Sequence, residues 1–186
     1  AVRYAGSDAV EVLLDAKASP DIGDKNNSTP LHFAAKACDV ANVLILIDMK
    51  AYLEAKNNDG QTALHLAATA FDGSDVMNAL LCGKADINAR DKKGKTPLHL
   101  VGARGNSAVA RLLVAAKANV GLTDNHGKTA LHYAAENGRH ETERELVAPS
   151  AEMALGGVSE GDNNASQTQE RKSRKRRGHS QGNKDQ

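Results

Sequence analysis

The chain has 186 residues, of which 40% are hydrophobic, 25% are charged and only 3% are aromatic, and its formal net charge is +1. No apolar run approaches the roughly 18 residues of a membrane-spanning helix, so no membrane span is predicted. The two cysteines, Cys38 and Cys82, form neither a Cys-x-x-Cys pair nor a metal-binding spacing. We therefore expect reduced, buried thiols and an intracellular protein of the cytoplasm or the nucleus.

A short phrase of Thr, Pro or Ala, Leu and His occurs four times, at residues 29–32, 62–65, 96–99 and 129–132. The steps between the copies are 33, 34 and 33 residues. A period of this size predicts stacked repeats, because a single unit cannot bury its apolar face alone. The expected units are a partial repeat at 1–23, repeats at 24–56, 57–90 and 91–123, and a terminal repeat at 124–149.

The first units differ in their completeness and length. Residues 1–23 lack the turn and the four-residue phrase that open the other units, so we expect the cut edge of a longer array. In repeat 24–56, an apolar run at residues 44–47 predicts a second helix. Repeat 57–90 holds one extra residue, which we expect in the turn 71–74 between its helices.

Repeat 91–123 shows the layout most clearly. A turn at 91–94 ends in Gly, and Thr96 then predicts a helix N-cap in front of a proline at the first helical position. Residues 105–106 end this helix, and the spacing of Val109 and Leu112 predicts the apolar face of a second one. Each unit is therefore expected to be a turn followed by two helices.

The terminal repeat is more polar than the others. Thr142 and Glu145 replace the apolar Val109 and Leu112 of the preceding unit. Together with the charged residues around them they predict a polar outer helix, as a terminal capping repeat requires. We expect Pro149 to end that helix, because proline removes a backbone donor.

Residues 150–186 contain no aromatic residue and are rich in Ser, Asn and Gln, which predicts a disordered tail. The tail has a net charge of +2, from seven Lys or Arg and five Asp or Glu, whereas residues 1–149 have a net charge of −1. Its basic cluster consists of Arg171, Lys172, Arg174, Lys175, Arg176 and Arg177.

A short basic run on flexible chain favours a nuclear localisation signal captured by an importin. Non-specific contact with nucleic acid or acidic lipid, and plain solvated disorder, remain open for the same cluster. No aromatic residues lie between its cations. Base stacking is therefore not predicted, and any nucleic-acid contact would be made to phosphate and would weaken with salt.

The repeated phrase at this period is similar to the signature of the ankyrin-repeat family. The resemblance covers residues 1–149. It implies an all-α fold, an ankyrin-repeat solenoid of stacked helix-turn-helix units with short β-hairpin turns between them. It also implies a monomer that binds protein partners as a scaffold, adaptor or regulatory arm, without catalysis and without a cofactor.

In that family the histidine of the phrase hydrogen-bonds the turn backbone and braces neighbouring repeats, so a structural role is expected for His32, His65, His99 and His132. A shared metal ion is excluded, because packed helices lie roughly 8–10 Å apart and zinc needs nitrogen ligands at about 2.0–2.1 Å.

Two tripeptides, Gly-Lys-Thr at 94–96 and 127–129, imitate the end of a phosphate-binding loop. That loop requires another Gly five positions earlier, where this chain has Ala89 and Leu122. No Ser or Cys lies in a recognisable nucleophile motif. The sequence therefore predicts no catalytic, metal-binding or cofactor-binding residue.

Where the family has Gly near the end of the second helix, this chain has Lys17, Lys50, Lys84 and Lys117. A non-Gly residue in left-handed geometry costs about 1 kcal/mol. A cation near a helix C-terminus recovers about 0.3–1 kcal/mol. Either a preference in helix-end residues or a lysine stripe that contacts an anionic partner explains the pattern.

Ankyrin arrays bind through their hairpin tips and the exposed sides of their first helices. Carried over position by position, the predicted partner-binding residues are Lys25, Asn26, Lys36, Lys56, Asn58, Asp59, Gln61, Arg90, Lys92, Lys93, Lys95, Arg104, Asn125, His126, Lys128 and Glu136. Nine are Lys or Arg and two are acidic, a balance of +7. This favours an acidic partner, although a merely solvated face remains open.

Two alternative roles stay open at this stage. The array is then either a targeting or regulatory arm of a larger enzyme or channel, or a nuclear regulator that uses the basic tail.

Overall fold

The computed structural model describes residues 19–155, and the chain divides after Ser150 into two compact units. Within the described residues the regular structure consists of eight helices, and no strand is assigned. The helices are α2 (Pro30–Lys36), α3 (Val40–Asp48), α4 (Ala63–Thr69), α5 (Ser74–Cys82), α6 (Pro97–Arg104), α7 (Ser107–Ala115), α8 (Ala130–Glu136) and α9 (His140–Leu155).

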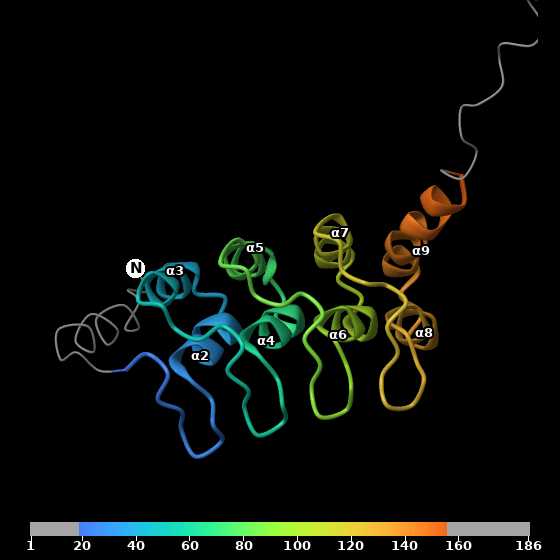
Figure 1. Ribbon diagram of the computed structural model, residues 1–186. Coiled ribbons are helices and arrows are strands. Elements are labelled where there is room, and N and C mark those ends of the chain that lie inside the picture. The colour runs from blue at the N-terminus through green and yellow to red at the C-terminus, as the bar shows by residue number, and fades with distance from the viewer. Residues whose placement is uncertain (1–18, 156–186) are drawn as a thin grey trace, which may run out of the picture. The chain divides into compact units, whose positions relative to one another are not determined.

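The helices of the first unit lie in two rows (Figure 1). The inner row contains α2, α4, α6 and α8, and the outer row contains α3, α5 and α7 and the first turns of α9. Neighbours touch along the inner row and, in the outer row, from α3 to α7, and each inner helix from α2 to α6 also contacts its outer partner. The turns between repeats project as tips below the inner row. This is a solenoid of helix pairs, as the period predicts.

The core lies between the two rows and repeats with the sequence. Leu31, Leu64 and Leu98, which share one position of the phrase, are each 1% exposed. On the outer row Val76 and Val109 are fully buried. Burying one such side chain contributes roughly 1.5–3 kcal/mol, so the period of the apolar residues holds the stack together.

Each inner helix begins at the threonine of the phrase, which has extended backbone angles and is followed three residues later by histidine. The threonine backbone N–H donates to the histidine Nδ1 over distances of 3.0–3.2 Å in the four copies. Because an N–H group can only donate, Nδ1 must be the unprotonated nitrogen. Histidine therefore replaces the Glu of an ordinary capping box.

The other histidine nitrogen, Nε2, then carries the proton and donates to the next repeat. His32 reaches the carbonyl of Gln61 at 2.9 Å, and His65 reaches that of Lys95 at 3.0 Å. His99 bonds the carbonyl of Lys128 in the same way, at 3.0 Å. The predicted bracing role is confirmed for these three histidines, which fasten α2, α4 and α6 to the following tip. Within the described residues the His132 side chain bonds only to Thr129.

The ends of the helices follow the predicted geometry. Gly105 is left-handed, with φ of 87°. The described lysines of the stripe, Lys50, Lys84 and Lys117, also have positive φ, of 64°, 71° and 68°. The extra residue of the third unit lies in the turn between α4 and α5, within residues 70–73.

The tips are held by side chains at their first residue rather than by strands. The Asp91 Oδ1 atom accepts backbone N–H bonds from Lys93 and Lys95, both at 2.8 Å. Neighbouring tips are joined by one backbone bond, such as Asn125 N–H to Lys93 O at 3.0 Å. The predicted β-hairpin turns are therefore turns without a ladder in the described chain, because a single bond between neighbours does not make one.

Two predictions for the last repeat are wrong. Thr142 is fully buried rather than on a polar outer face, because it takes the inward position that Val109 holds in the preceding repeat. Pro149 does not end α9, which continues to Leu155. Proline removes only one donor, and residues 151–155 are strong helix formers. Residues 1–18, with most of the partial repeat and Lys17, and residues 156–186, with the basic cluster, lie outside the described residues.

Candidate protein-binding face

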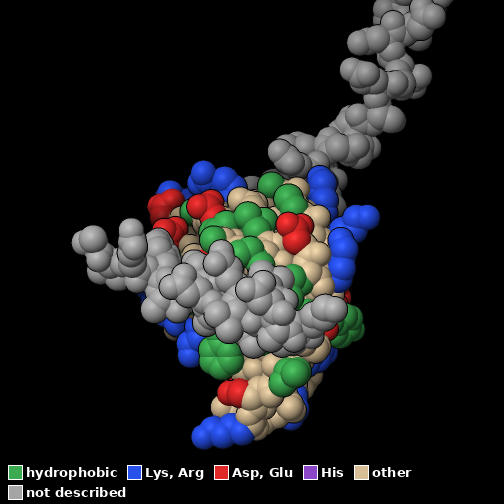
Figure 2. Space-filling view, turned by 90° about the vertical axis from the view of Figure 1, so that its left-hand side faces the viewer, with side chains coloured by type: hydrophobic (Ala, Val, Ile, Leu, Met, Phe, Trp, Pro, Cys, Tyr) green, Lys and Arg blue, Asp and Glu red, His purple; other side chains and the backbone are tan. Residues whose placement is uncertain are grey.

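The predicted partner-binding residues lie on the tips and on the inner helices. Thirteen of the sixteen are exposed, and Gln61, Lys95 and Lys128 are half-buried. Seen from the end of the array at which α2 and α3 lie, Lys and Arg side chains reach the lower end, where the tips project (Figure 2). The solenoid thus collects residues that are separated by about one repeat in the sequence onto one face.

Several of these residues also join neighbouring repeats. The Lys56 ammonium group donates to the carbonyl of Arg90 at 3.0 Å, and the Arg90 guanidinium group donates to the carbonyl of Thr123 at 2.8 Å. The Asn125 side chain donates to the carbonyl of Lys92 at 3.1 Å. These contacts stiffen the line of tips, so a partner would meet a preorganised surface.

At the end of the face towards α8, the cations surround Tyr133. The ammonium group of Lys95 lies 4.2 Å from the ring centroid, and that of Lys128 lies 5.6 Å away, both within cation–π range. Lys128 also forms a 2.6 Å ion pair with Glu136. The positive charge at this end is therefore partly compensated within the protein.

The Tyr133 hydroxyl donates to Asp124 Oδ2 at 2.7 Å. Burial and this hydrogen bond raise the pKa of Tyr133 to about 12. Burial opposes ionisation of Asp124, but the bonds from Tyr133 and from the backbone N–H groups of Lys128 and His126 outweigh it and lower the pKa of Asp124 to about 2. Asp124 is thus a structural anion that holds the tip, not an acid–base group.

Five cations of the face have no internal partner for their charge. Within residues 19–147, the side chains of Lys25, Lys36, Lys92, Lys93 and Arg104 form no hydrogen bond or ion pair, and all five are exposed. Their charge is available to a partner. The sequence predicted all nine cations of the face as one group. The structure divides them, because Lys56, Arg90, Lys95 and Lys128 make contacts within the protein and the other five do not.

Sequence reasoning missed an apolar stripe on the same face. Phe33, Leu66, Leu100 and Tyr133 each follow the histidine of the phrase directly. Phe33 is 54% exposed, and the other three are half-buried. The recurrence of an apolar residue at this one position was the signal that could have found the stripe.

Two grooves open on the surface of the first unit. One, of about 230 Å³, lies between the second and third repeats and is lined by Phe33, Leu66 and Lys36 and by polar groups of the tips. The other, of about 360 Å³, is formed by the turns that follow α4 and α6, and it is lined by Arg104 and the fully exposed Phe71. The first groove is lined by several predicted partner-binding residues of two repeats, and the second by one of them, Arg104.

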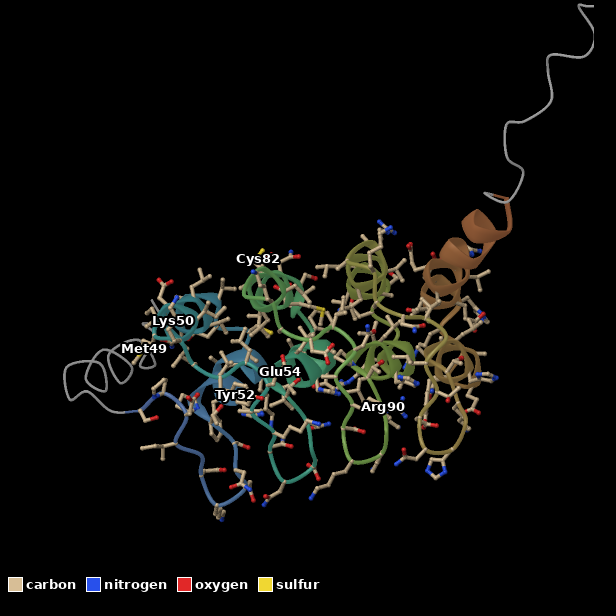
Figure 3. All side chains as sticks on the ribbon, in the orientation of Figure 1. Met49, Lys50, Tyr52, Glu54, Cys82 and Arg90 are labelled. Carbon is tan, nitrogen blue, oxygen red and sulfur yellow. The ribbon has the colours of Figure 1, made fainter. Side chains whose placement is uncertain are left out.

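The outer side of the array carries other groups. Figure 3 places Lys50 and Cys82 beside the outer helices, whereas Tyr52 and Arg90 lie on the loops that lead to the tips. Cys82 is exposed and Cys38 is half-buried, so the prediction of buried thiols is wrong. Cys82 is exposed because it is the last residue of α5, at the solvent-facing end of the helix. Neither cysteine forms a disulfide within the described residues.

No group of His, Cys, Asp or Glu in residues 19–147 could hold a metal ion. None of the helices within the described range is long and apolar enough to cross a membrane.

The protein is a solenoid of repeats in which the face formed by the tips and inner helices is exposed to solvent. A family model described as ankyrin repeats in three copies matches residues 1–91 and 68–155. The chain belongs to the ankyrin-repeat family. It is also similar to the human neurogenic locus notch homolog protein 1, with 39% identity over 108 residues. The match covers 57% of this chain and 4% of that protein.

Ankyrin repeats are general protein–protein interaction modules and are typically not catalytic. The resemblance that the sequence indicated is therefore confirmed at the level of family and of fold. The chain spans only a small part of the relative, so the match says nothing about the activity of a longer protein.

Proposed function

We propose that this array binds an acidic segment of a partner protein on the face formed by its tips and inner helices. The observation that carries the proposal is a set of five exposed cations that have no partner within residues 19–147, namely Lys25, Lys36, Lys92, Lys93 and Arg104. Cations that are already paired would have to exchange partners on binding. These five exchange only water and counterions, so an acidic segment gains their full attraction.

The residues between the cations support a protein rather than a small anion as the partner. The cations lie in two repeats, 24–56 and 91–123, that are separated by a third repeat, and the apolar stripe runs beside them. A single phosphate or carboxylate reaches one or two of these groups. A chain segment reaches all of them, and its affinity sums over several contacts while each stays weak.

The proposal is tested by reversing charge on two neighbouring tip residues, Lys92→Glu and Lys93→Glu. The comparison variant is Lys84→Glu with Lys117→Glu, which makes the same change of charge on the lysine stripe at exposed ends of the outer helices. Loss of binding in this variant alone would place the partner on that stripe instead. Proteins captured by the immobilised wild type are identified by mass spectrometry. Their affinities for the three purified variants are then measured at low and high salt.

We expect the tip variant to lose the partner and the comparison variant to keep it, and the affinity of the wild type to fall as salt rises. Equal binding to all three proteins would contradict the proposal. Circular dichroism spectra that match the wild type exclude loss of fold as the cause.

A second candidate, a regulatory arm within a larger protein, is favoured by the match to a relative in which the corresponding segment is 4% of the length. Both candidates use the same face. They differ in whether the acidic segment belongs to a separate protein or to the same one, which the full-length sequence decides.

A further inference from the structure

The apolar stripe, Phe33, Leu66, Leu100 and Tyr133, has one side chain on each inner helix at the same position after the buried histidine. Because α2 packs on α4, α4 on α6 and α6 on α8, these positions follow one another along the face. Packed helices lie roughly 8–10 Å apart, so the stripe offers an apolar contact about every 8–10 Å.

A ligand that uses successive contacts must present apolar side chains at the same interval and on one side. A β-strand rises about 3.3 Å per residue and alternates its faces, so its same-side residues recur at about 6.6 Å or 13 Å and match poorly. A polyproline II segment rises about 3.1 Å per residue with three residues per turn. Its every third side chain recurs on one side at about 9.3 Å, which matches the stripe.

An α-helix also places residues seven apart on one side, at about 10.5 Å. The first groove favours an extended chain instead. It holds about 230 Å³ between Phe33 and Leu66, and the amide side chains of Asn26 and Gln61 line it. These amides form no side-chain hydrogen bond within the described residues. An extended backbone has free N–H and C=O groups to pair with them, whereas a helix has used its own.

The charged residues of the face determine which residues of the partner are favoured between its apolar side chains. Lys36 lines the same groove. Lys92 and Lys93, which have no partner in the part of the chain that the structure describes, lie on the tip two repeats further along. Two carboxylates, Asp24 and Asp59, also line the groove. The Asp24 Oδ1 atom accepts hydrogen bonds from the backbone N–H groups of Asn26 and Ser28, both at 2.8 Å. The acidic side chains of a partner would therefore face the tips of the later repeats, where the cations are.

We propose that the partner segment is an acidic stretch in the polyproline II conformation whose apolar side chains recur at every third residue, one for each repeat that it crosses. This inference rests on the proposed function and specifies the partner of the same face. The spacing is set by the packing of the helices, and the acidity by the free cations.

The experiment uses three fluorescent peptides of identical composition, made of Leu, Glu, Pro and Ala. The first has Leu at every third position, the second at every second position, and the third has Leu seven positions apart in a helix-favouring order. Binding to the full chain is measured by fluorescence anisotropy. We expect the first peptide to bind at least about tenfold more tightly than the other two.

Two substitutions locate the bound peptide. Phe33→Ser removes an exposed member of the stripe, and Leu44→Ser is the control, because Leu44 is also exposed, at 49%, but lies on the outer helix α3. We expect Phe33→Ser to weaken the first peptide several-fold and Leu44→Ser to leave it unchanged.

The outcomes separate this inference from the proposed function. If all three peptides bind equally and all are lost on Lys92→Glu with Lys93→Glu, the spacing is refuted and the acidic face stands. If the first peptide binds best but its affinity is unchanged by that charge reversal, the role of the cations is refuted. Tighter binding of the second or third peptide, or no binding of any at millimolar concentration, overturns the inference.

Discussion

The histidine brace makes a quantitative prediction for His99→Ala. His99 is 1% exposed, accepts the backbone N–H of Thr96 at 3.1 Å and donates to the carbonyl of Lys128 at 3.0 Å. Truncation leaves one buried donor and one buried acceptor without a partner. Each such group costs about 1–3 kcal/mol, so the free energy of unfolding should fall by about 2–6 kcal/mol before any cavity is counted.

His132→Ala is the matched control. His132 ends the same phrase and accepts the Thr129 backbone N–H at 3.1 Å, but its residue is exposed, so water replaces the lost contact. The expected cost is that of a helix cap, about 1 kcal/mol. Both variants are unfolded in urea at pH 7.5 and followed by far-UV circular dichroism. Equal destabilisation, or a cost below about 1 kcal/mol for His99→Ala, would refute the bracing argument.

Three further predictions follow from the same contacts. Burial outweighs the favourable hydrogen bonds and lowers the pKa of His65, as of His99, below 6.5, so both are neutral in the fold and bind more protons when unfolded. Their contribution to stability is then complete above pH 6.5 and is lost as the pH falls through the lowered pKa values, which urea unfolding at several pH values measures. Gly94→Ala should destabilise more than Gly127→Ala. Both glycines have positive φ, 74° and 75°, but a Cβ at Gly94 meets the following tip and a Cβ at Gly127 meets nothing within 4 Å. For Gly127→Ala we expect only the backbone cost of about 1–2 kcal/mol. An equal loss in the free energy of unfolding for both variants would show that the tip moves aside for the new Cβ at no cost. Tyr133→Phe should raise the pKa of Asp124 from about 2 towards 3.8, as followed by NMR titration, and an unmoved pKa would assign the shift to the backbone donors alone.

The sequence predicted most of the scaffold because the scaffold depends on local chemistry. A threonine at the start of each inner helix, a glycine in the turn and a lysine at the end of an outer helix each act within a few residues of themselves. Their positions along the period were enough to predict the caps, the left-handed residues and the place of the extra residue. Where a local rule competed with the surroundings, the prediction was wrong.

Thr142 and Pro149 illustrate that competition. By residue type Thr142 is polar, but its side chain has the shape of valine and lies at the inward position of the stack, where it is fully buried with its hydroxyl unpaired. Pro149 lacks a donor, but the helix formers that follow it continue α9 to Leu155. For Thr142 the register of the helix decided the outcome, and for Pro149 the residues that follow it did.

By itself the sequence determined the family, the repeat register and the surplus of cations at the variable positions, because a period is a property of order along the chain. Only the tertiary structure decided which of those cations are free. Lys56 and Arg90 reach carbonyl groups 34 and 33 residues away, whereas Lys92 and Lys93 form no such contact within the described chain. It also decided that four apolar residues from four repeats follow one another along a single face. Contacts across such separations depend on how the helices stack, and no local rule supplies them.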